Sequence, residues 1–169
     1  NIEYFSTGQI QRQIAKELNM TTTDLNKYME NHYEIDERID REVVEISGRY
    51  RDFIIDSRMA WHFIPDAFKV YLIVDGRIAA QRVFCDSRVS ENYSSIETAL
   101  EKLTERRQSE KFRYKHLYNV DLDNFGNYNL VLDTSYITPD EVLENINRYY
   151  NEWLNDNSLS AVLISANRI

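Results

Sequence analysis

The chain has 169 residues, a formal net charge of −8, 43% hydrophobic residues and 28% charged residues. This length fits one domain, and the acidic balance argues against non-specific binding of nucleic acid or anionic lipid. The single Cys85 excludes a disulfide scaffold, and the sequence shows neither a signal-peptide pattern nor an apolar run near the ~20 residues of a membrane span. We therefore expect a cytoplasmic protein that works on neither nucleic acid nor membranes.

Three helices are predicted in the N-terminal third of the chain, over residues 8–19, TTTDLNKYMENH (21–32) and EIDERIDREVVEI (34–46). The second of them begins at a threonine cap, and the third carries charges on its outer faces. The apolar residues that we expect to face the core recur at helical spacing. They are Ile10, Ile14 and Leu18; Leu25 and Met29; and Ile35, Ile39, Val43 and Ile46.

Three short apolar runs predict buried parallel strands: RDFIID (51–56), KVYLIVD (69–75) and NYNLVLDTS (127–135). Between the last two, a polar helix is expected to begin at a capping box, Ser94-x-x-Glu97, and to run to about Tyr118. A second capping box, TPDE (138–141), predicts a helix through Trp153. Strands that alternate with helices indicate an α/β layered domain with a mostly parallel sheet.

The carboxyl ends of these strands gather acids, hydroxyls and arginines, and ligands of such sheets bind at that edge. The segments concerned are Ser6-Thr7, Asp56-Ser57-Arg58, Asp75-Gly76-Arg77 and Asp133-Thr134-Ser135. A hydroxyl, a glycine and a fresh helix N-terminus, as in FSTGQIQR (5–12), suit a phosphate or a sugar. The pattern predicts a site for a small polar ligand at this edge.

Four arginines strengthen that prediction. Arg12 lies early on the first helix, and Arg58 follows a strand end by two residues. Arg106 and Arg113 are seven residues apart on the long helix and share a face, with Glu110 between them. Because guanidinium groups bind phosphate oxygens in a bidentate manner, arginines from three segments indicate an anion site for a phosphorylated small molecule.

Four segments, in order, resemble cytidylate kinase of the compact archaeal type. They are FSTGQIQRQIAKELNM, EIDERIDR, FIIDSRMAWHFIPDAFKVYLIVD and ERRQSEKFRYKHLYNVDLDNFGNYNLVLDTSYITPDEV. The resemblance implies a three-layer P-loop nucleoside monophosphate kinase fold that moves the γ-phosphoryl group of ATP to CMP or dCMP with Mg²⁺. It further implies a single domain over residues 1–169, with an acceptor-binding insertion at 8–48, a lid at 82–107 and a C-terminal extension at 156–169.

The same resemblance assigns roles to individual residues. Thr7 and Arg12 match the hydroxyl and arginine that hold the acceptor nucleotide, and Arg58 matches the arginine that meets the acceptor phosphate. Arg106 and Arg113 match arginines that face phosphates, so the expected catalytic residues are Arg58, Arg106 and Arg113. Glu110 would help to hold the acceptor ribose or base. Arg82, which begins the lid, would act with Arg106 on the donor side. The three scattered histidines give no protein metal site.

Two features depart from the family pattern. Ser57 stands where the family has glycine, and no segment reads G-x-x-x-x-G-K-[ST]. In the family that loop follows a central first strand, upstream of the point where this sequence begins. Three interpretations stay open: the sequence starts downstream of that strand, the tail segment AVLIS (161–165) takes its place, or the chain is a diverged, inactive relative. Without the strand, unpaired edges are expected inside the sheet.

Two classes of function remain open at this point. The first is a kinase, with AMP, UMP, shikimate or a sugar as alternative acceptors. The second is a kinase-like module without chemistry that binds a nucleotide or a partner.

Overall fold

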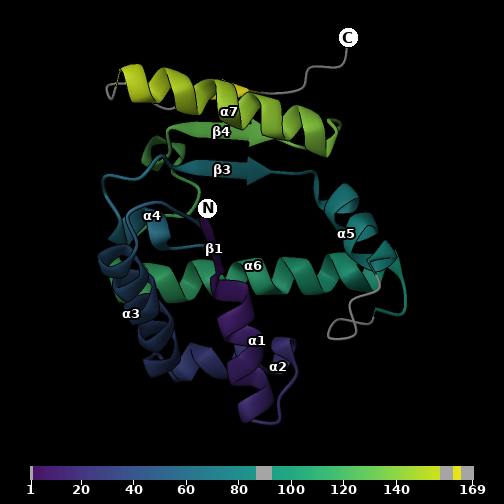
Figure 1. Ribbon diagram of the computed structural model, residues 1–169. Helices are drawn as coiled ribbons and strands as arrows, with labels where there is room; N and C mark the ends of the chain where they lie inside the picture. Colours follow the sequence, from purple (N-terminus) through teal and green to yellow (C-terminus); the bar gives the residue numbers. More distant parts are fainter. Residues whose placement is uncertain (1, 87–92, 157–161, 165–169) are drawn as a thin grey trace.

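The computed structural model describes residues 2–86, 93–156 and 162–164 (Figure 1). The middle of the expected lid, 87–92, and most of the expected extension after residue 156 lie outside these residues. The elements follow in this order: β1 (Glu3–Ser6), α1 (Thr7–Glu17), α2 (Thr22–Tyr28), the 3₁₀ turn η1 (Met29–Asn31), α3 (Glu34–Arg49), β2 (Phe53–Asp56), α4 (Ala60–Phe63), β3 (Val70–Ile73), α5 (Gly76–Cys85), α6 (Ile96–Tyr118), the 3₁₀ turn η2 (Phe125–Asn127), β4 (Leu130–Asp133), α7 (Pro139–Asn155) and β5 (Val162–Ile164).

Five parallel strands form two separate sheets, with orders β1–β2 and β3–β4–β5. The predicted α/β class with parallel strands is confirmed. The unpaired edges that we expected inside the sheet are also present, because the strands divide into two sheets. Among the described residues, β2 and β3 pair with each other nowhere, so each has one edge without a strand partner. The tail strand β5 pairs with β4 on the side away from β3. The interpretation in which the tail joins the two halves of the sheet is therefore wrong.

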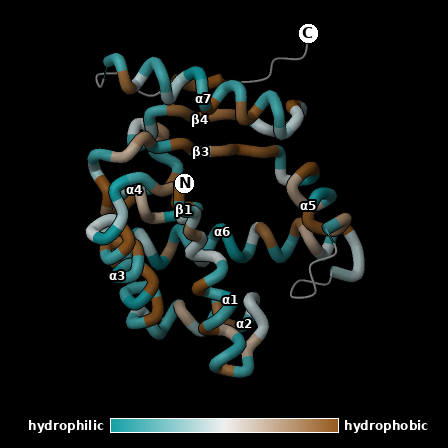
Figure 2. Tube along the Cα trace, viewed as in Figure 1, coloured by the Kyte–Doolittle hydropathy of each residue, from teal (hydrophilic) through white to brown (hydrophobic). Residues whose placement is uncertain are grey.

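The long α6 crosses the molecule between two groups of elements (Figure 1). On one side, α2 and η1 pack directly against it, and α1 and α3 pack on each other. On the other side lie β3 and β4, with α7 packed against β4. β3 and β4 are hydrophobic almost throughout, whereas hydrophilic and hydrophobic residues alternate along the helices (Figure 2). Among the residues described here, no helix combines the length and apolar character that crossing a bilayer requires.

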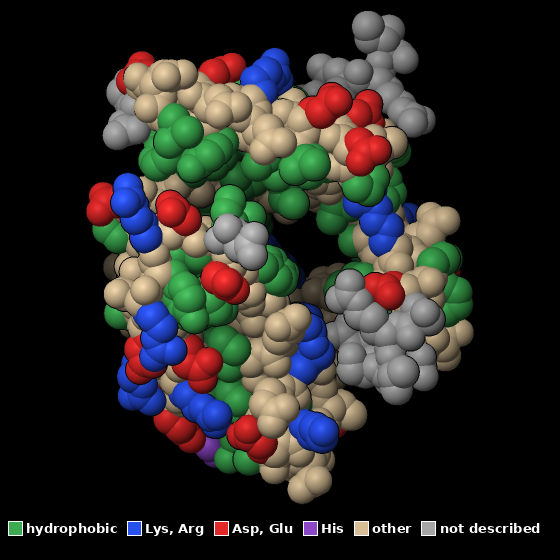
Figure 3. Space-filling view, viewed as in Figure 1, with side chains coloured by type: hydrophobic (Ala, Val, Ile, Leu, Met, Phe, Trp, Pro, Cys, Tyr) green, Lys and Arg blue, Asp and Glu red, His purple; other side chains and the backbone are tan. Residues whose placement is uncertain are grey.

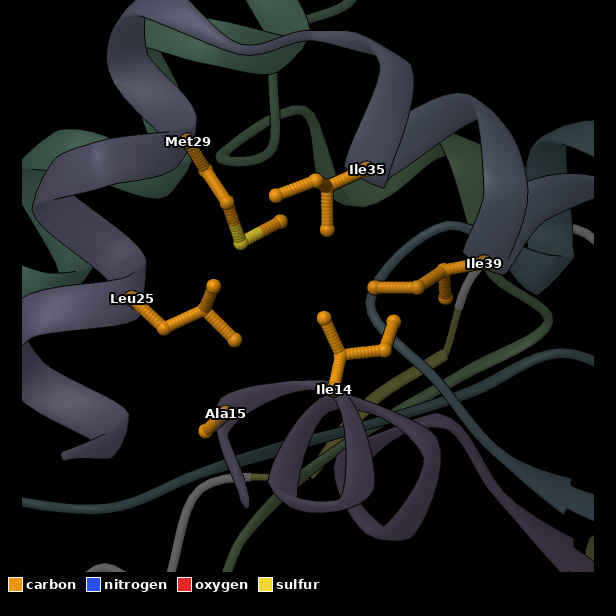
Figure 4. Close-up of a cluster of buried hydrophobic side chains, with 6 residues drawn as sticks. All are labelled: Ile14, Ala15, Leu25, Met29, Ile35 and Ile39. Atoms are coloured by element: carbon orange, nitrogen blue, oxygen red, sulfur yellow. The ribbon is translucent and has the colours of Figure 1, made fainter. Parts of the chain in front are cut away.

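The helical part of the molecule has its own core, where α1, α2, η1 and α3 meet (Figure 4). Its buried members are Ile14, Ala15, Leu25, Met29, Ile35 and Ile39. The inward positions predicted for α2 and for the first half of α3 are thus confirmed. Fully buried aliphatic side chains of this kind each stabilise the fold by about 2–5 kcal/mol against truncation to alanine, which fixes α1 and α3 relative to each other.

Leu18 is an exception to the predicted core, because 43% of it is exposed. Helix α1 ends at Glu17, and Asn19 adopts a left-handed conformation with φ of 53°. The Met20 N–H then bonds the Ala15 carbonyl at 2.8 Å, a helix C-terminal closure. The chain turns away at this point, so Leu18 leaves the apolar face that its spacing had suggested.

Hydroxyl caps set the starts of α2, α6 and α7. The threonine cap of α2 and the capping box of α7 form as predicted, through Thr21 and Thr138. The cap of α6 is one residue later than expected, because the Ser95 hydroxyl, rather than that of Ser94, accepts the backbone N–H of Thr98 at 3.2 Å. The helix then runs to Tyr118, as its pattern indicated.

Candidate functional site

Two of the predicted arginines meet at one buried carboxylate. Arg58, from the loop after β2, places Nε 3.2 Å from Glu110 Oε2, and Arg106, one turn earlier on α6, places Nε 3.0 Å from Glu110 Oε1. The Glu110 side chain is only 4% exposed, whereas 53% of Arg58 and 29% of Arg106 are exposed. We call Arg58, Arg106 and Glu110 the Glu110 cluster. In this cluster the two guanidinium groups are partly exposed to solvent, and the buried Glu110 carboxylate orients both of them.

The charges in this cluster favour one another. Burial raises the pKa of Glu110, but the Arg58, Arg106 and Arg113 guanidinium groups outweigh burial and hold that pKa below its usual range. In return, the Glu110 carboxylate raises the pKa of Arg58. The Glu110 carboxyl and the Arg58 guanidinium are therefore both charged at neutral pH. Because one carboxylate faces two guanidiniums, the cluster carries a net positive charge that suits an incoming anion.

Ser57 shapes the loop that carries Arg58. Its hydroxyl accepts the backbone N–H groups of Met59 and Ala60, both at 3.2 Å, at the start of α4. The Trp61 indole N–H donates to the Arg58 carbonyl at 3.1 Å. The serine that departs from the family pattern thus closes a hydrogen-bonded turn around Arg58, as serine hydroxyls do in turns.

Thr7 and Arg12 lie at the carboxyl edge of the β1–β2 sheet. The Thr7 hydroxyl donates to the Asp56 carbonyl at 3.3 Å and so joins the ends of the two strands. Arg12 is half-buried one turn further along α1, and within the described residues it has no hydrogen-bond or ion-pair partner. A Cβ on Gly8 would lie 3.5 Å from Arg12 Nη1, so the glycine and the arginine are neighbours. Arg12 can therefore bind an anion without first breaking an ion pair.

Arg113 is placed differently from Arg58 and Arg106. Its side chain is 1% exposed, and its Nε lies 2.8 Å from Asp36 Oδ2 of α3. Its Nη1 donates to the Ser109 hydroxyl at 2.8 Å and to the Asn26 carbonyl at 3.3 Å. Arg113 is thus buried and bonded to α2 and α3, whereas Arg58 and Arg106 reach the solvent.

Arg82 belongs to a second polar edge, at the carboxyl ends of β3 and β4. From the last turn of α5 it donates to the Thr134 and Ser135 carbonyls at 2.7 and 3.2 Å. The Ser135 hydroxyl accepts the Asp75 N–H at 2.9 Å and bonds Asp133. These contacts tie α5 to the loop after β4, apart from the Glu110 cluster. On the face shown in Figure 3, the surface is hollowed between the part with β3 and β4 and the part with α1 and α6, and Lys or Arg side chains lie at its rim.

Sequence reasoning missed three buried polar residues next to this site: Gln11, Asn26 and Asp36, which are 8%, 4% and 2% exposed. Gln11 stands between Ile10 and the buried Ile14 in the apolar stripe of α1, and Asp36 directly follows Ile35. A polar residue beside an inward-facing apolar position was the signal available. Which group it would meet depends on how the helices pack, and the spacing along one helix does not contain that information.

The main cavity described here and the distribution of possible metal ligands both bear on where the site lies. A cavity of about 560 Å³ lies between β1, α1 and α3, and its lining includes Gln9, Ile10 and Arg41 but no member of the Glu110 cluster and neither Thr7 nor Arg12. Over the described ranges, no group of three or more histidine, cysteine or acidic side chains could hold a metal ion. The chain's own described residues therefore do not form a metal cage.

Comparisons with known proteins show which family this chain resembles. The model of the cytidylate kinase-like family matches residues 1–136. A protein named cytidylate kinase from Methanocaldococcus jannaschii is 36% identical over 140 residues, which cover 80% of this chain and 75% of that protein. Its namesake from Sulfurisphaera tokodaii is 30% identical over 159 residues, which cover 93% and 86% of the two chains. A third, from Pyrococcus furiosus, is 35% identical over 136 residues, with 80% and 68% covered.

No solved structure gives a significant match. The family match spans most of the chain, including β1 to β4 and all three members of the Glu110 cluster. The chain therefore belongs to the cytidylate kinase-like family.

Proposed function

We propose that this protein is a nucleoside monophosphate kinase that transfers the γ-phosphoryl group of ATP to CMP or dCMP. The observation that carries the proposal is the Glu110 cluster, in which two partly exposed arginines are held by one buried acid. The proteins with 28–36% identity to this chain are named cytidylate kinase, and this supports a cytidine acceptor. The lone, exposed Cys85 is compatible with a reducing cytoplasm.

The acceptor phosphate would bind between Arg58 and Arg106. Its two negative charges would meet guanidinium donors that Glu110 already orients, so little side-chain entropy is lost on binding. Arg12 would add a third cation from the start of α1, and the Thr7 hydroxyl would mark the edge of the pocket. Glu110 would act through the two guanidinium groups that it orients, because its side chain is 4% exposed and both carboxylate oxygens already accept from arginines. Phosphoryl transfer depends mainly on such positioning and on charge neutralisation.

The donor nucleotide would bind near the second polar edge, beside Arg82 and the loop after β4. Mg²⁺ in such reactions is held largely by the nucleotide phosphates and neutralises their charge. The ion would arrive bound to ATP. Arg82 would hold the loop after β4 in place, because its two bonds to backbone carbonyls fix that loop against α5.

A calorimetric titration with CMP, dCMP, AMP and UMP at one moderate salt concentration tests this function. We expect selective binding of the cytidine nucleotides. Arg58→Ala should weaken CMP binding by about 10- to 100-fold, since a charge-assisted hydrogen bond contributes about 1.5–3 kcal/mol. Arg51→Ala, which removes an exposed arginine a few residues earlier, should leave CMP binding unchanged.

Unchanged CMP affinity in the Arg58→Ala protein would contradict the acceptor role of the cluster. Binding of CMP without any ADP release in the presence of ATP and Mg²⁺ would instead favour a nucleotide-binding module without chemistry.

A further inference from the structure

A continuous polar chain leads from the Glu110 cluster into the helical part of the molecule. Arg106 bonds Glu110 through Nε, and its Nη2 donates to Gln11 Oε1 of α1 at 3.4 Å. Gln11 Nε2 donates to Asn26 Oδ1 of α2 at 3.0 Å. Glu110, Gln11 and Asn26 are all buried. Residues from three different helices therefore fix one partly exposed guanidinium group.

The contacts of Asn26 settle which way the Gln11 amide points. Asn26 Nδ2 donates to the Thr22 carbonyl at 2.9 Å, so its Oδ1 is the end that faces Gln11 and must accept. Gln11 therefore presents its NH₂ group to Asn26 and to the Met29 sulfur, which lies 3.6 Å away. Its carbonyl oxygen is left to face Arg106. This orientation follows from the donor and acceptor inventory of the two amides alone.

The chemistry of an amide suits this position better than that of an acid. Glu110 already provides Arg106 with a carboxylate, and a second one would cancel the remaining positive charge of the cluster. The Gln11 carbonyl accepts a hydrogen bond without adding charge, so it restricts the guanidinium plane and leaves its attraction for an anion intact. Among the contacts with described residues, Arg106 is held at Nε and at Nη2, and contacts on two nitrogens restrict a planar group more than one contact does.

We propose that Gln11 is a positioning residue for the acceptor phosphate, which acts by orienting Arg106. The inference rests on the proposed acceptor function of the Glu110 cluster. It assigns to Gln11 no contact with the nucleotide, and it links the first helix of the expected insertion directly to the anion site.

The test is a double-mutant cycle on Gln11 and Arg106, read by calorimetry with CMP and with cytidine, which lacks the phosphate. Methionine has nearly the shape of glutamine and would lie beside Met29, so Gln11→Met removes the hydrogen bonds with little change in packing. We expect it to weaken CMP binding about tenfold, the effect of losing one hydrogen bond to a charged group, and to change cytidine binding less than about twofold. In an Arg106→Ala background the same change should alter CMP binding less than about twofold.

The matched control is Gln13→Met, two residues along α1, where the exposed Gln13 side chain bonds only Glu17 among the described residues. It should leave both affinities unchanged. Should Gln11→Met fail to fold, Gln11→Glu keeps the acceptor toward Arg106 while adding a charge, and we expect it to weaken CMP binding at least tenfold, more strongly at low salt.

Equal weakening of CMP and cytidine by Gln11→Met, an undiminished effect in the Arg106→Ala background, or normal CMP affinity in Gln11→Glu would each overturn the inference. These results leave CMP binding by the unchanged protein in place, so they are distinct from a failure of the proposed function. If the unchanged protein binds no CMP, both proposals fall together.

Discussion

Asp40 is a buried carboxylate whose ionisation opposes folding. It is 7% exposed, and its Oδ2 accepts a hydrogen bond from the Tyr118 hydroxyl at 2.6 Å. Burial is the main cause that raises the pKa of Asp40 from an ordinary value of 3.8 to about 6, and the negative charge of Asp36 raises that pKa further. The hydrogen bond from Tyr118 and the positive charge of Arg113 lower it by less. The native state therefore holds the Asp40 proton more tightly than the unfolded chain does.

This difference predicts a specific pH dependence. The stability that the protonated Asp40 contributes is present below about pH 3.8 and is lost as the pH rises to about 6. Asparagine at this position keeps an acceptor for Tyr118 and does not titrate. The free energy of unfolding of Asp40→Asn minus that of the unchanged protein should therefore grow by about 2 kcal/mol between pH 4 and pH 6.5 and then level off. Urea unfolding at several pH values measures the difference, and a flat profile would count against the burial argument.

The Glu110 cluster could be predicted from sequence, whereas the place of Arg113 could not. Arg106 and Glu110 are four residues apart on one helix, and Arg58 follows a strand that ends at the same edge, so local rules bring them together. Arg113 shares their helix face, yet it is buried against Asp36 because α3 packs there. That contact joins residues 77 positions apart in sequence. Periodicity within either helix says nothing about it.

At the level of whole elements, periodicity located α1, α2, α3, α6 and α7 and the strands β2, β3 and β4, whereas α5 was not predicted. Hydroxyl caps decided where α2, α6 and α7 begin. Thr21 and Thr138 cap α2 and α7 as their sequence context indicated. For α6 two adjacent serines compete, and the capping pattern alone favoured Ser94. In the structure the Ser95 hydroxyl accepts the Thr98 N–H, and within the described part of the chain the Ser94 hydroxyl bonds only the Thr98 side chain. The C-terminal end of α1 was likewise not predicted from spacing. There the left-handed Asn19 ends the helix, so Leu18 does not turn inward.

The two serines give a matched pair for measuring this cap. Ser95→Ala should lower the free energy of unfolding by about 1 kcal/mol, because it leaves a helix N-terminal N–H without its acceptor. Ser94→Ala removes a neighbouring hydroxyl of the same size and should cost less than about half as much, since it bonds no backbone donor of α6. Chemical denaturation of both variants measures the difference. A larger loss of unfolding free energy for Ser94→Ala than for Ser95→Ala would show that Ser94 is the cap of α6.

At the scale of the whole molecule, α6 joins parts that the strands leave separate. The sheets β1–β2 and β3–β4–β5 share no strand pairing among the residues described. Helix α6 contacts α2 and η1 on one side, and on the other its Arg107 donates to the Tyr71 hydroxyl of β3. It also carries Arg106, Glu110 and Arg113. Three apolar runs do not name their neighbours, so only the absence of the G-x-x-x-x-G-K-[ST] loop, and not the runs themselves, indicated unpaired edges. The burial that the runs predicted holds for β4, whereas Ile54 of β2 and Leu72 of β3 are 57% and 49% exposed.

This arrangement predicts where an acceptor nucleotide will slow amide exchange. Arg106 reaches α1 through Gln11, and Arg113 reaches α2 and α3, so binding at the Glu110 cluster should stabilise α1, α2, α3 and α6 as one unit. At a CMP concentration about 100 times the Kd, linkage supplies about 2.7 kcal/mol, which is roughly 100-fold slower exchange for amides that exchange through opening of that unit. Amides of β4 and α7, which pack on each other, should change little. Hydrogen exchange with and without CMP measures both regions, with Arg58→Ala as the control that should reduce the protection at the same CMP concentration to about 2- to 10-fold. Protection concentrated on β4 and α7 would place the nucleotide at the second polar edge and move the acceptor site away from Glu110.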